Sequence, residues 1–192
     1  MTTRTNILTP NTLAEASSLR WLKTSALVVT ASLFMALCAH VTIPLIFSPV
    51  PITLQPFGVL LIGMLLGSRA GAAALVLYLM EGAAGLPVFS PAGPGGMLQL
   101  LGPTGGFLMA SPVAAYVAGK IFEARKNISG ALLASLAAEC VLFTVGAAWF
   151  MAVMQVSPAQ AMFMAVLPYI PGEVLKVAVA SAIVARWHGQ RS

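Results

Sequence analysis

Six apolar segments follow one another along this chain, and their succession limits the possible folds more than any other feature. They occupy residues 21–47, 54–66, 70–86, 105–122, 128–154 and 162–185. A helix needs about 20 apolar residues to cross the hydrocarbon of a bilayer. Charged residues make up only 8% of the chain, against about 25% in soluble domains. The sequence therefore predicts an all-α integral membrane protein, with six transmembrane helices in one domain spanning residues 21–185.

The basic residues are segregated by this topology. With six spans, all but Lys176 lie on one side, and the connections near 48–56, 87–104 and 155–161 contain none. The segregated residues are Arg4, Arg20, Lys23, Arg69, Lys120, Arg125, Lys126, Arg186 and Arg191. Because Lys and Arg accumulate in cytoplasmic loops, we expect both termini in the cytoplasm, with residues 1–20 as a polar lead and 186–192 as a tail. The net charge of +5 then reflects topology and not a nucleic-acid partner.

Three ionisable residues, Lys176, Glu173 and Glu139, stand out within the predicted spans. Such a group costs at least ~2.5 kcal/mol at the bilayer centre, so it is rare there and usually functional. Glu173 and Lys176 are three residues apart and project from one face of a helix. We expect Lys176 to meet an anionic group of a small ligand and Glu173 to accept hydrogen bonds from its N–H groups. An ion pair that only joins two helices is the alternative, and Glu139 has no assigned role.

Prolines interrupt the last apolar segment just before this pair. Pro168 and Pro171 break the run, and Pro171 suits the first turn of a restarted helix, where a missing N–H costs nothing. Broken helices at membrane depth are tolerated where protein or a cavity covers the freed backbone, and they are typical of transport sites. The pattern predicts a binding site near the restart.

Two uncharged connections belong to the side that lacks basic residues. Residues 50–56 carry Thr53 and Gln55, and residues 82–106 combine many Gly and Pro residues with apolar ones such as Phe89. Because flexible linkers are polar, the second connection is interpreted as a packed cap over a cavity. A loop that lies on the lipid headgroups is the alternative.

The sequence offers no catalytic or cofactor motif. There is no G-x-x-x-x-G-K-[ST] loop for ATP, His40 and His188 are isolated, and Cys38 and Cys140 lie in apolar stretches. We therefore expect no enzyme activity, no metal and no cofactor. In the first span, Ser32 and Ala36 have the spacing that allows close helix packing, either within the chain or against another membrane subunit.

Four stretches together resemble the BioY family, the biotin-specific substrate-binding components of energy-coupling-factor transporters. They are Val50–Gln55, Tyr78–Phe89, Gly102–Phe107 and Pro171–Lys176. The resemblance covers residues 24–185 and implies a multi-pass subunit of the bacterial inner membrane that captures biotin from outside. It also implies partners, namely a transmembrane coupling subunit and cytoplasmic ATPase subunits that bind the ATP.

The resemblance assigns roles to particular residues. Glu173 and Lys176 match the residues that contact biotin, Thr53 and Gln55 match polar positions of the loop that closes over it, and Phe89 and Ser90 match the pocket lining. The A-x-x-x-A docking pattern of helix one is replaced here by Ser32-x-x-x-Ala36. Which end of biotin Lys176 contacts is left open, as are a sister subunit for another vitamin and a membrane scaffold without a ligand.

Overall fold

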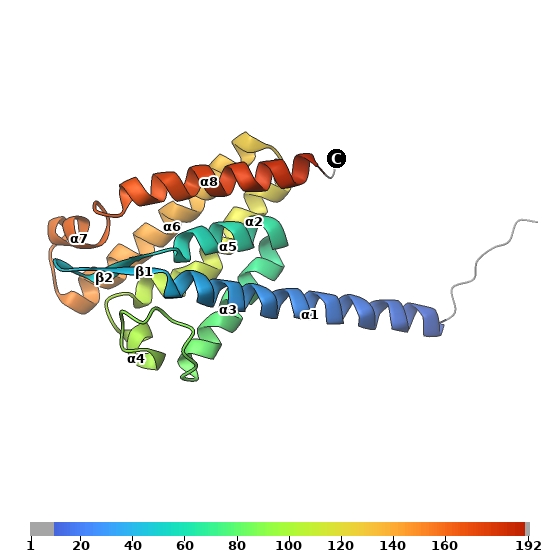
Figure 1. Cartoon of the computed structure of the whole chain (residues 1–192), viewed down its shortest axis with the longest axis horizontal. Helices are drawn as coiled ribbons and strands as arrows, with labels where there is room; N and C mark the ends of the chain where they lie inside the picture. The colour runs from blue at the N-terminus through green and yellow to red at the C-terminus, as the bar shows by residue number, and fades with distance from the viewer. Residues whose placement is uncertain (1–9, 191–192) are drawn as a thin grey trace, which may run out of the picture.

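The computed structural model describes the backbone of residues 10–190 and the side chains of residues 21–190. Helices form a bundle, and a two-stranded hairpin lies at one of its ends (Figure 1). The elements in chain order are α1 (Pro10–His40), β1 (Thr42–Leu45), β2 (Ser48–Thr53), α2 (Gln55–Leu66), α3 (Ser68–Ala83), α4 (Gly96–Leu101), α5 (Gly105–Ala124), α6 (Ile128–Met154), α7 (Pro158–Ala165) and α8 (Ile170–Gly189).

The helices support a multi-pass membrane protein. Among the described residues, α1, α5 and α6 are each long and apolar enough to cross a bilayer, and α7 with α8 form a fourth candidate span bent by 56°. Helix α2 is apolar but has only 12 residues, and α3 has 16. Each predicted apolar segment contains helix, while the count of spans by length and composition is three or four.

The hairpin corrects the all-α prediction and the end of the first predicted span. Helix α1 ends at His40, and residues 42–53 form two antiparallel strands in which Ile43 pairs with Ile52. Pro44, Pro49 and Pro51 fall in this stretch. Proline lacks the N–H that a helix interior requires but is tolerated in edge strands, so the chain leaves the helix here.

The last predicted span is also corrected, because it consists of two helices. Helix α7 starts earlier than predicted, at Pro158, where Ser157 and Gln160 form a capping box. Residues 166–169 are not helical, and α8 begins at Ile170 with Pro171 in its first turn. The predicted break and the restart at Pro171 are therefore confirmed.

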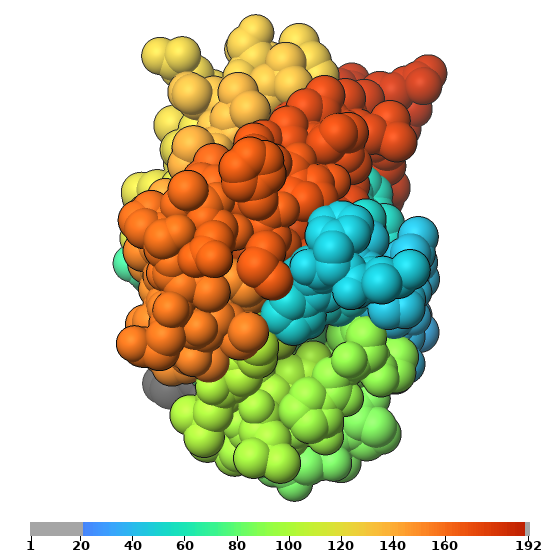
Figure 2. Space-filling view, turned by 90° about the vertical axis from the view of Figure 1, so that its left-hand side faces the viewer, coloured from blue at the N-terminus to red at the C-terminus, as the bar shows by residue number. Residues whose placement is uncertain are grey.

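The hairpin, α7 and the connection that carries α4 come together at one end of the molecule, which we call the hairpin end (Figure 2). The 82–106 connection contains the short helix α4, with Gln99 and Leu100 buried. Val88, Phe89 and Ser90 are also buried, whereas Leu86 and Leu98 are exposed. The prediction of a packed segment thus holds for its inner residues.

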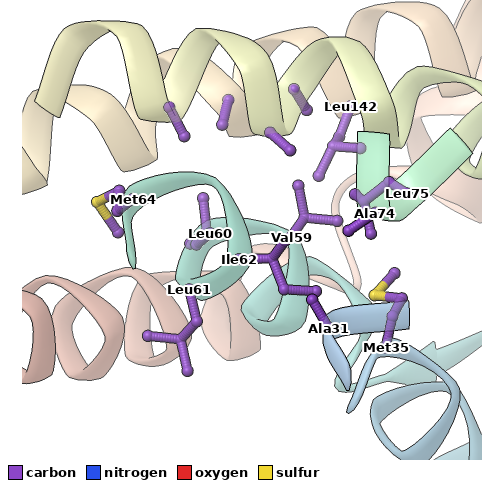
Figure 3. Packing of buried hydrophobic residues seen from close by; sticks show 14 of the residues in the cluster. Ala31, Met35, Val59, Leu60, Leu61, Ile62, Met64, Ala74, Leu75 and Leu142 are labelled. Carbon is purple, nitrogen blue, oxygen red and sulfur yellow. The ribbon is translucent and has the colours of Figure 1, made fainter. Parts of the chain in front are cut away.

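Helix α2 lies at the centre of the hydrophobic core. Its residues Gly58–Met64 are all buried, as expected for a helix that is apolar on every side. Figure 3 shows Val59, Leu60 and Ile62 surrounded by side chains of α1, α3, α5 and α6. The middle of α2 is therefore packed against protein on all sides, whereas Leu65 near its end is 38% exposed.

Small residues allow α2, α3 and α5 to approach closely. A Cβ atom added at Gly119 of α5 would lie 2.6 Å from the Gly63 carbonyl oxygen of α2. One added at Gly71 of α3 would lie 3.0 Å from the Gly63 Cα atom. These contacts lie toward the other end of the bundle, which holds the α2–α3 and α5–α6 turns and which we call the basic end. It is named for Arg69, Lys120, Arg125, Lys126 and Arg186.

Candidate functional site

A cavity of about 80 Å³ lies at the hairpin end, between the hairpin, the core helices and the α7–α8 break. A single water needs only about 10–15 Å³ on this measure, so the space admits a larger group. The polar residues that line it are Thr53, Gln55, Ser90, Gln99, Thr104, Ser111, Glu139, Tyr169 and Glu173. Apolar residues such as Met35, Phe107 and Phe143 complete the wall. A mostly apolar wall with a few placed polar groups is typical of small-molecule sites.

Glu173 and Lys176 form a buried ion pair beside this cavity. Lys176 Nζ donates to Glu173 Oε1 at 2.8 Å and to the Thr53 carbonyl oxygen at 2.7 Å. Only 6% of Glu173 and 9% of Lys176 is exposed. The i, i+3 pairing on one face of α8 is confirmed, and Lys176 joins α8 to the end of the hairpin. Glu173 lines the cavity, whereas Lys176 is not among the lining residues.

Glu139 of α6 lies in the same wall and is 7% exposed. It is close enough to Glu173 and Lys176 to interact with their charges. Glu139 Oε1 and Glu173 Oε2 are the two buried side-chain oxygens that lack a hydrogen-bond partner among the described residues. Buried polar atoms nearly always have a partner, so these two require an explanation.

The end of the hairpin is fixed to the core by neutral side chains. The Gln55 amide nitrogen Nε2 donates to the Tyr78 hydroxyl at 3.0 Å, and the Gln55 backbone N–H donates to Thr53 Oγ1 at 3.2 Å. Ser90 Oγ donates to Thr42 Oγ1 of β1 at 3.1 Å. Thr53, Gln55 and Ser90 therefore lie together at the cavity, as predicted.

Phe89 has a different position from the one expected. Its ring packs edge-on against Tyr78, with centroids 5.3 Å apart, and it is buried but does not line the cavity. A side chain at Gly82 would overlap this ring. The structure assigns Phe89 to the packing behind the cavity wall.

Tyr169 joins the hairpin to the α7–α8 break. Its hydroxyl donates to the Val50 carbonyl oxygen and lies 3.2 Å from Ser48 Oγ. Ser48 Oγ donates in turn to the Met164 carbonyl oxygen at 2.7 Å, a carbonyl near the end of α7. The hairpin thus supplies a hydrogen-bond donor to a carbonyl group that the helix break leaves free, as a broken helix at membrane depth requires. Tyr169 is not among the residues predicted for the site, although its place between Pro168 and Pro171 at the break of the last apolar segment could have indicated it.

The chain matches the BioY family over residues 8–192. It belongs to the BioY family. It is 35% identical to the "Probable biotin transporter BioY" of Pyrococcus horikoshii over 159 residues, which cover 82% of this chain and 93% of that protein. It is also 35% identical over 174 residues to the "Biotin transporter BioY" of Rhizobium etli, covering 84% and 92% of the two chains.

A solved structure supports the same relationship. The fold resembles the crystal structure of the S-component for biotin from an ECF-type ABC transporter, with a TM-score of 0.80 and 28% identity. The match covers 88% of this chain and 93% of that one. The family predicted from the four sequence stretches is thereby confirmed, and the mostly helical fold is that of an S-component.

Ser32 and Ala36, the predicted docking pair, are used largely for packing within the chain. Ser32 is fully buried and donates a hydrogen bond to the Glu81 carboxylate of α3. Ala36 is partly buried against the core. Ser32 therefore takes the alternative expected from the sequence, packing within the chain, and its hydroxyl is used by Glu81. A docking role for the pair stays a prediction.

Among the described residues, no three His, Cys, Asp or Glu side chains are grouped as a metal site would require. His40 bonds to its own helix at Ala36, and His188 packs edge-on against Phe122. The expectation that no cofactor is bound stays a prediction.

Proposed function

We propose that this chain binds biotin in the cavity at the hairpin end and mediates its uptake, without catalysis. The observation that carries the proposal is the buried Glu173–Lys176 pair, whose Glu173 Oε2 is unpartnered in an otherwise mostly apolar cavity. Biotin has two ureido N–H donors, an apolar ring and a carboxylate. A carboxylate acceptor, apolar walls and neutral hydrogen-bonding groups complement these features. The names of the relatives support the same ligand.

Glu173, Thr53, Gln55 and Ser90 are proposed to contact the ligand. Lys176 has three N–H donors, two of which are used by Glu173 and Thr53. We propose that Lys176 positions the Glu173 carboxylate and the Thr53 carbonyl group, and that its third N–H is available to the ligand. Phe89 supports the wall through Tyr78.

The proposed topology has six spans, with both termini in the cytoplasm of a bacterium and the protein in its inner membrane. Residues 1–20 and 186–192 are the cytoplasmic segments of this proposal, and residues 21–185 are its membrane domain. Arg69, Lys120, Arg125, Lys126 and Arg186 belong to the basic end, away from the cavity. Under the positive-inside rule, the basic end faces the cytoplasm and the cavity faces outward. Capture of biotin from the outer side then follows.

ATP is proposed to act only on partner ATPase subunits, through a transmembrane coupling subunit, because the chain has no phosphate-binding loop. Docking through α1 would use its lipid-facing side. There, Ala36 is partly exposed between Leu33, 55% exposed, and Leu37, 69% exposed.

The test is calorimetric binding of biotin to the purified protein in detergent or nanodiscs. We expect tight binding by the wild type and at least a hundredfold weaker binding by Lys176→Ala, because the substitution leaves Glu173 as an unpaired buried charge. Lys120→Ala, which removes an exposed lysine of α5, is the matched control and should bind as the wild type does.

Two results would count against the proposal. No binding by folded wild-type protein would reject biotin as the ligand and leave another vitamin or a scaffold role. Unchanged binding by Lys176→Ala would reject this site.

A further inference from the structure

Glu139 is a buried carboxylate for which the resemblance supplies no role. It projects from α6, an element different from the one that carries Glu173, and both side chains line the same cavity. Both are more than nine-tenths buried, and each has one oxygen without a hydrogen-bond partner among the described residues. Two acceptors from two helices therefore border one space.

The charges near these acceptors determine what can occupy that space. Lys176 balances one carboxylate, and its ammonium is already bonded to Glu173 and to the Thr53 carbonyl oxygen. The part of the cavity wall that the described residues form contains no Lys or Arg. This part of the cavity therefore repels an anion and favours hydrogen-bond donors, and bonds from N–H groups to carboxylates are stronger than those to neutral acceptors.

The rest of the polar wall is neutral. Gln99 and Thr104 come from the 82–106 connection, and their amide and hydroxyl can donate to a ligand, whereas the Ser90 hydroxyl already donates to Thr42. A ligand with N–H groups at one end and a carboxylate at the other would meet like charge if its carboxylate pointed at Glu139. The neutral donors are the better partners for that carboxylate.

We infer that Glu139 is a second ligand-binding carboxylate, which with Glu173 accepts the two N–H groups of a cyclic urea and selects for ligands that carry them. The inference rests on the proposed function, because it takes biotin as the ligand. Beyond that function, the inference names Glu139 as the acceptor of the second N–H. It also orients the ligand, with the urea toward Glu139 and Glu173 and the carboxylate toward the neutral donors.

The first test measures biotin affinity of Glu139→Gln. We expect a loss of about tenfold to a hundredfold, the range for a hydrogen bond to a charged group. Glu81→Gln is the matched control, since Glu81 is a carboxylate of α3 that does not line the cavity. It should bind biotin within a factor of about two of the wild type. Equal affinities of Glu139→Gln and the wild type would overturn the inference.

The second test uses 2-iminobiotin, in which a cyclic guanidine that is protonated at neutral pH replaces the urea. Two carboxylates suit this cation, so the wild type should bind it, and Glu139→Gln should lose about tenfold more affinity for it than for biotin. Equal losses for both ligands would show that Glu139 acts through packing and would overturn the inference. So would a wild type that binds biotin but not the analogue, a result that needs no folded variant. Failure of the wild type to bind biotin would instead reject the proposed function.

Discussion

The carboxylates at the basic end and at the hairpin end of the bundle differ in burial and in hydrogen bonding: Glu123 is exposed, whereas Glu139 and Glu173 are buried. At the basic end, Glu123 Oε1 accepts from the backbone N–H of Ser68 at 2.7 Å and from its hydroxyl at 3.1 Å. Ser68 is the first residue of α3, and the first N–H groups of a helix have no partner within it. Glu123 therefore provides an acceptor for one of them. The helices around this contact touch through glycine.

At the hairpin end, Glu139 and Glu173 each have an oxygen without a partner among the described residues, and a cavity lies beside them. The same residue type therefore caps a helix where the chain supplies the donors and, in our proposal, binds a ligand where it does not. Unsatisfied acceptors in a membrane protein are costly, which supports the proposal that a ligand supplies these donors.

The largest expected effect is at the close contact of α5 with α2. Gly119→Leu would place side-chain atoms against the Gly63 carbonyl oxygen and the Ser68 backbone, which overpacks a core that cannot yield. We expect a loss of ~3 kcal/mol of stability, at the upper end for overpacking, seen as a lower thermal unfolding midpoint in detergent. Gly172→Ala at the hairpin end is the control, because a Cβ there meets nothing within 4 Å. An unfolding midpoint that is equal for both variants would contradict close packing at the basic end.

The second prediction compares the same substitution, Glu→Gln, at Glu173 of the hairpin end and at Glu123 of the basic end. Glu173→Gln should weaken biotin binding by about tenfold or more, because it removes a charged acceptor. Glu123→Gln should leave affinity unchanged and lower stability by about 0.5 kcal/mol, because the amide oxygen can still accept from Ser68 and only the negative charge near the start of α3 is lost. Calorimetry and thermal unfolding of both variants measure the two quantities. Similar losses of affinity would show that the two ends do not differ as described.

A smaller effect is expected where Tyr169 holds the hairpin. Tyr169→Phe removes the hydroxyl that contacts Val50 and Ser48. The hairpin should then open more readily, and biotin release should be about two- to tenfold faster, in keeping with one hydrogen bond. Release is followed by chasing bound labelled biotin with excess unlabelled biotin. Tyr116→Phe, an exposed tyrosine of α5, is the control. An unchanged release rate for Tyr169→Phe would mean that this hydroxyl does not hold the hairpin.

The smallest effect is expected for Ser32→Ala. Its hydroxyl donates to Glu81 between α1 and α3, and hydrogen bonds between membrane helices average only ~0.6 kcal/mol. The unfolding midpoint should fall slightly, with biotin affinity unchanged. Thr30→Ala, whose hydroxyl bonds to its own helix at Ala26, should change neither. A marked loss of affinity in Ser32→Ala would show that the bond to Glu81 supports the binding site as well as the helix packing.

The local sequence pattern by itself determined where several helices begin and which residues share a helix face. Long, mainly apolar runs predicted α5 and α6, whose expected and observed starts agree at Gly105 and Ile128, because a long apolar helix satisfies its own backbone. Pro171 predicted the restart before Glu173, because proline suits the first turn of a helix. A proline alone does not end a helix, since Pro112 lies inside α5. The i, i+3 spacing predicted that Glu173 and Lys176 share one face, which a helix enforces without tertiary contacts.

Contacts between distant segments were decided only by the tertiary structure. Glu139 and Glu173 meet at one cavity because α6 packs on α8, and Lys176 reaches Thr53, 123 positions away in the chain. The hairpin, Phe89 behind the wall and Ser32 bonded to Glu81 likewise depend on partners far away in sequence. Helix periodicity fixes which face a residue occupies, but which other helix covers that face follows from packing of the whole bundle.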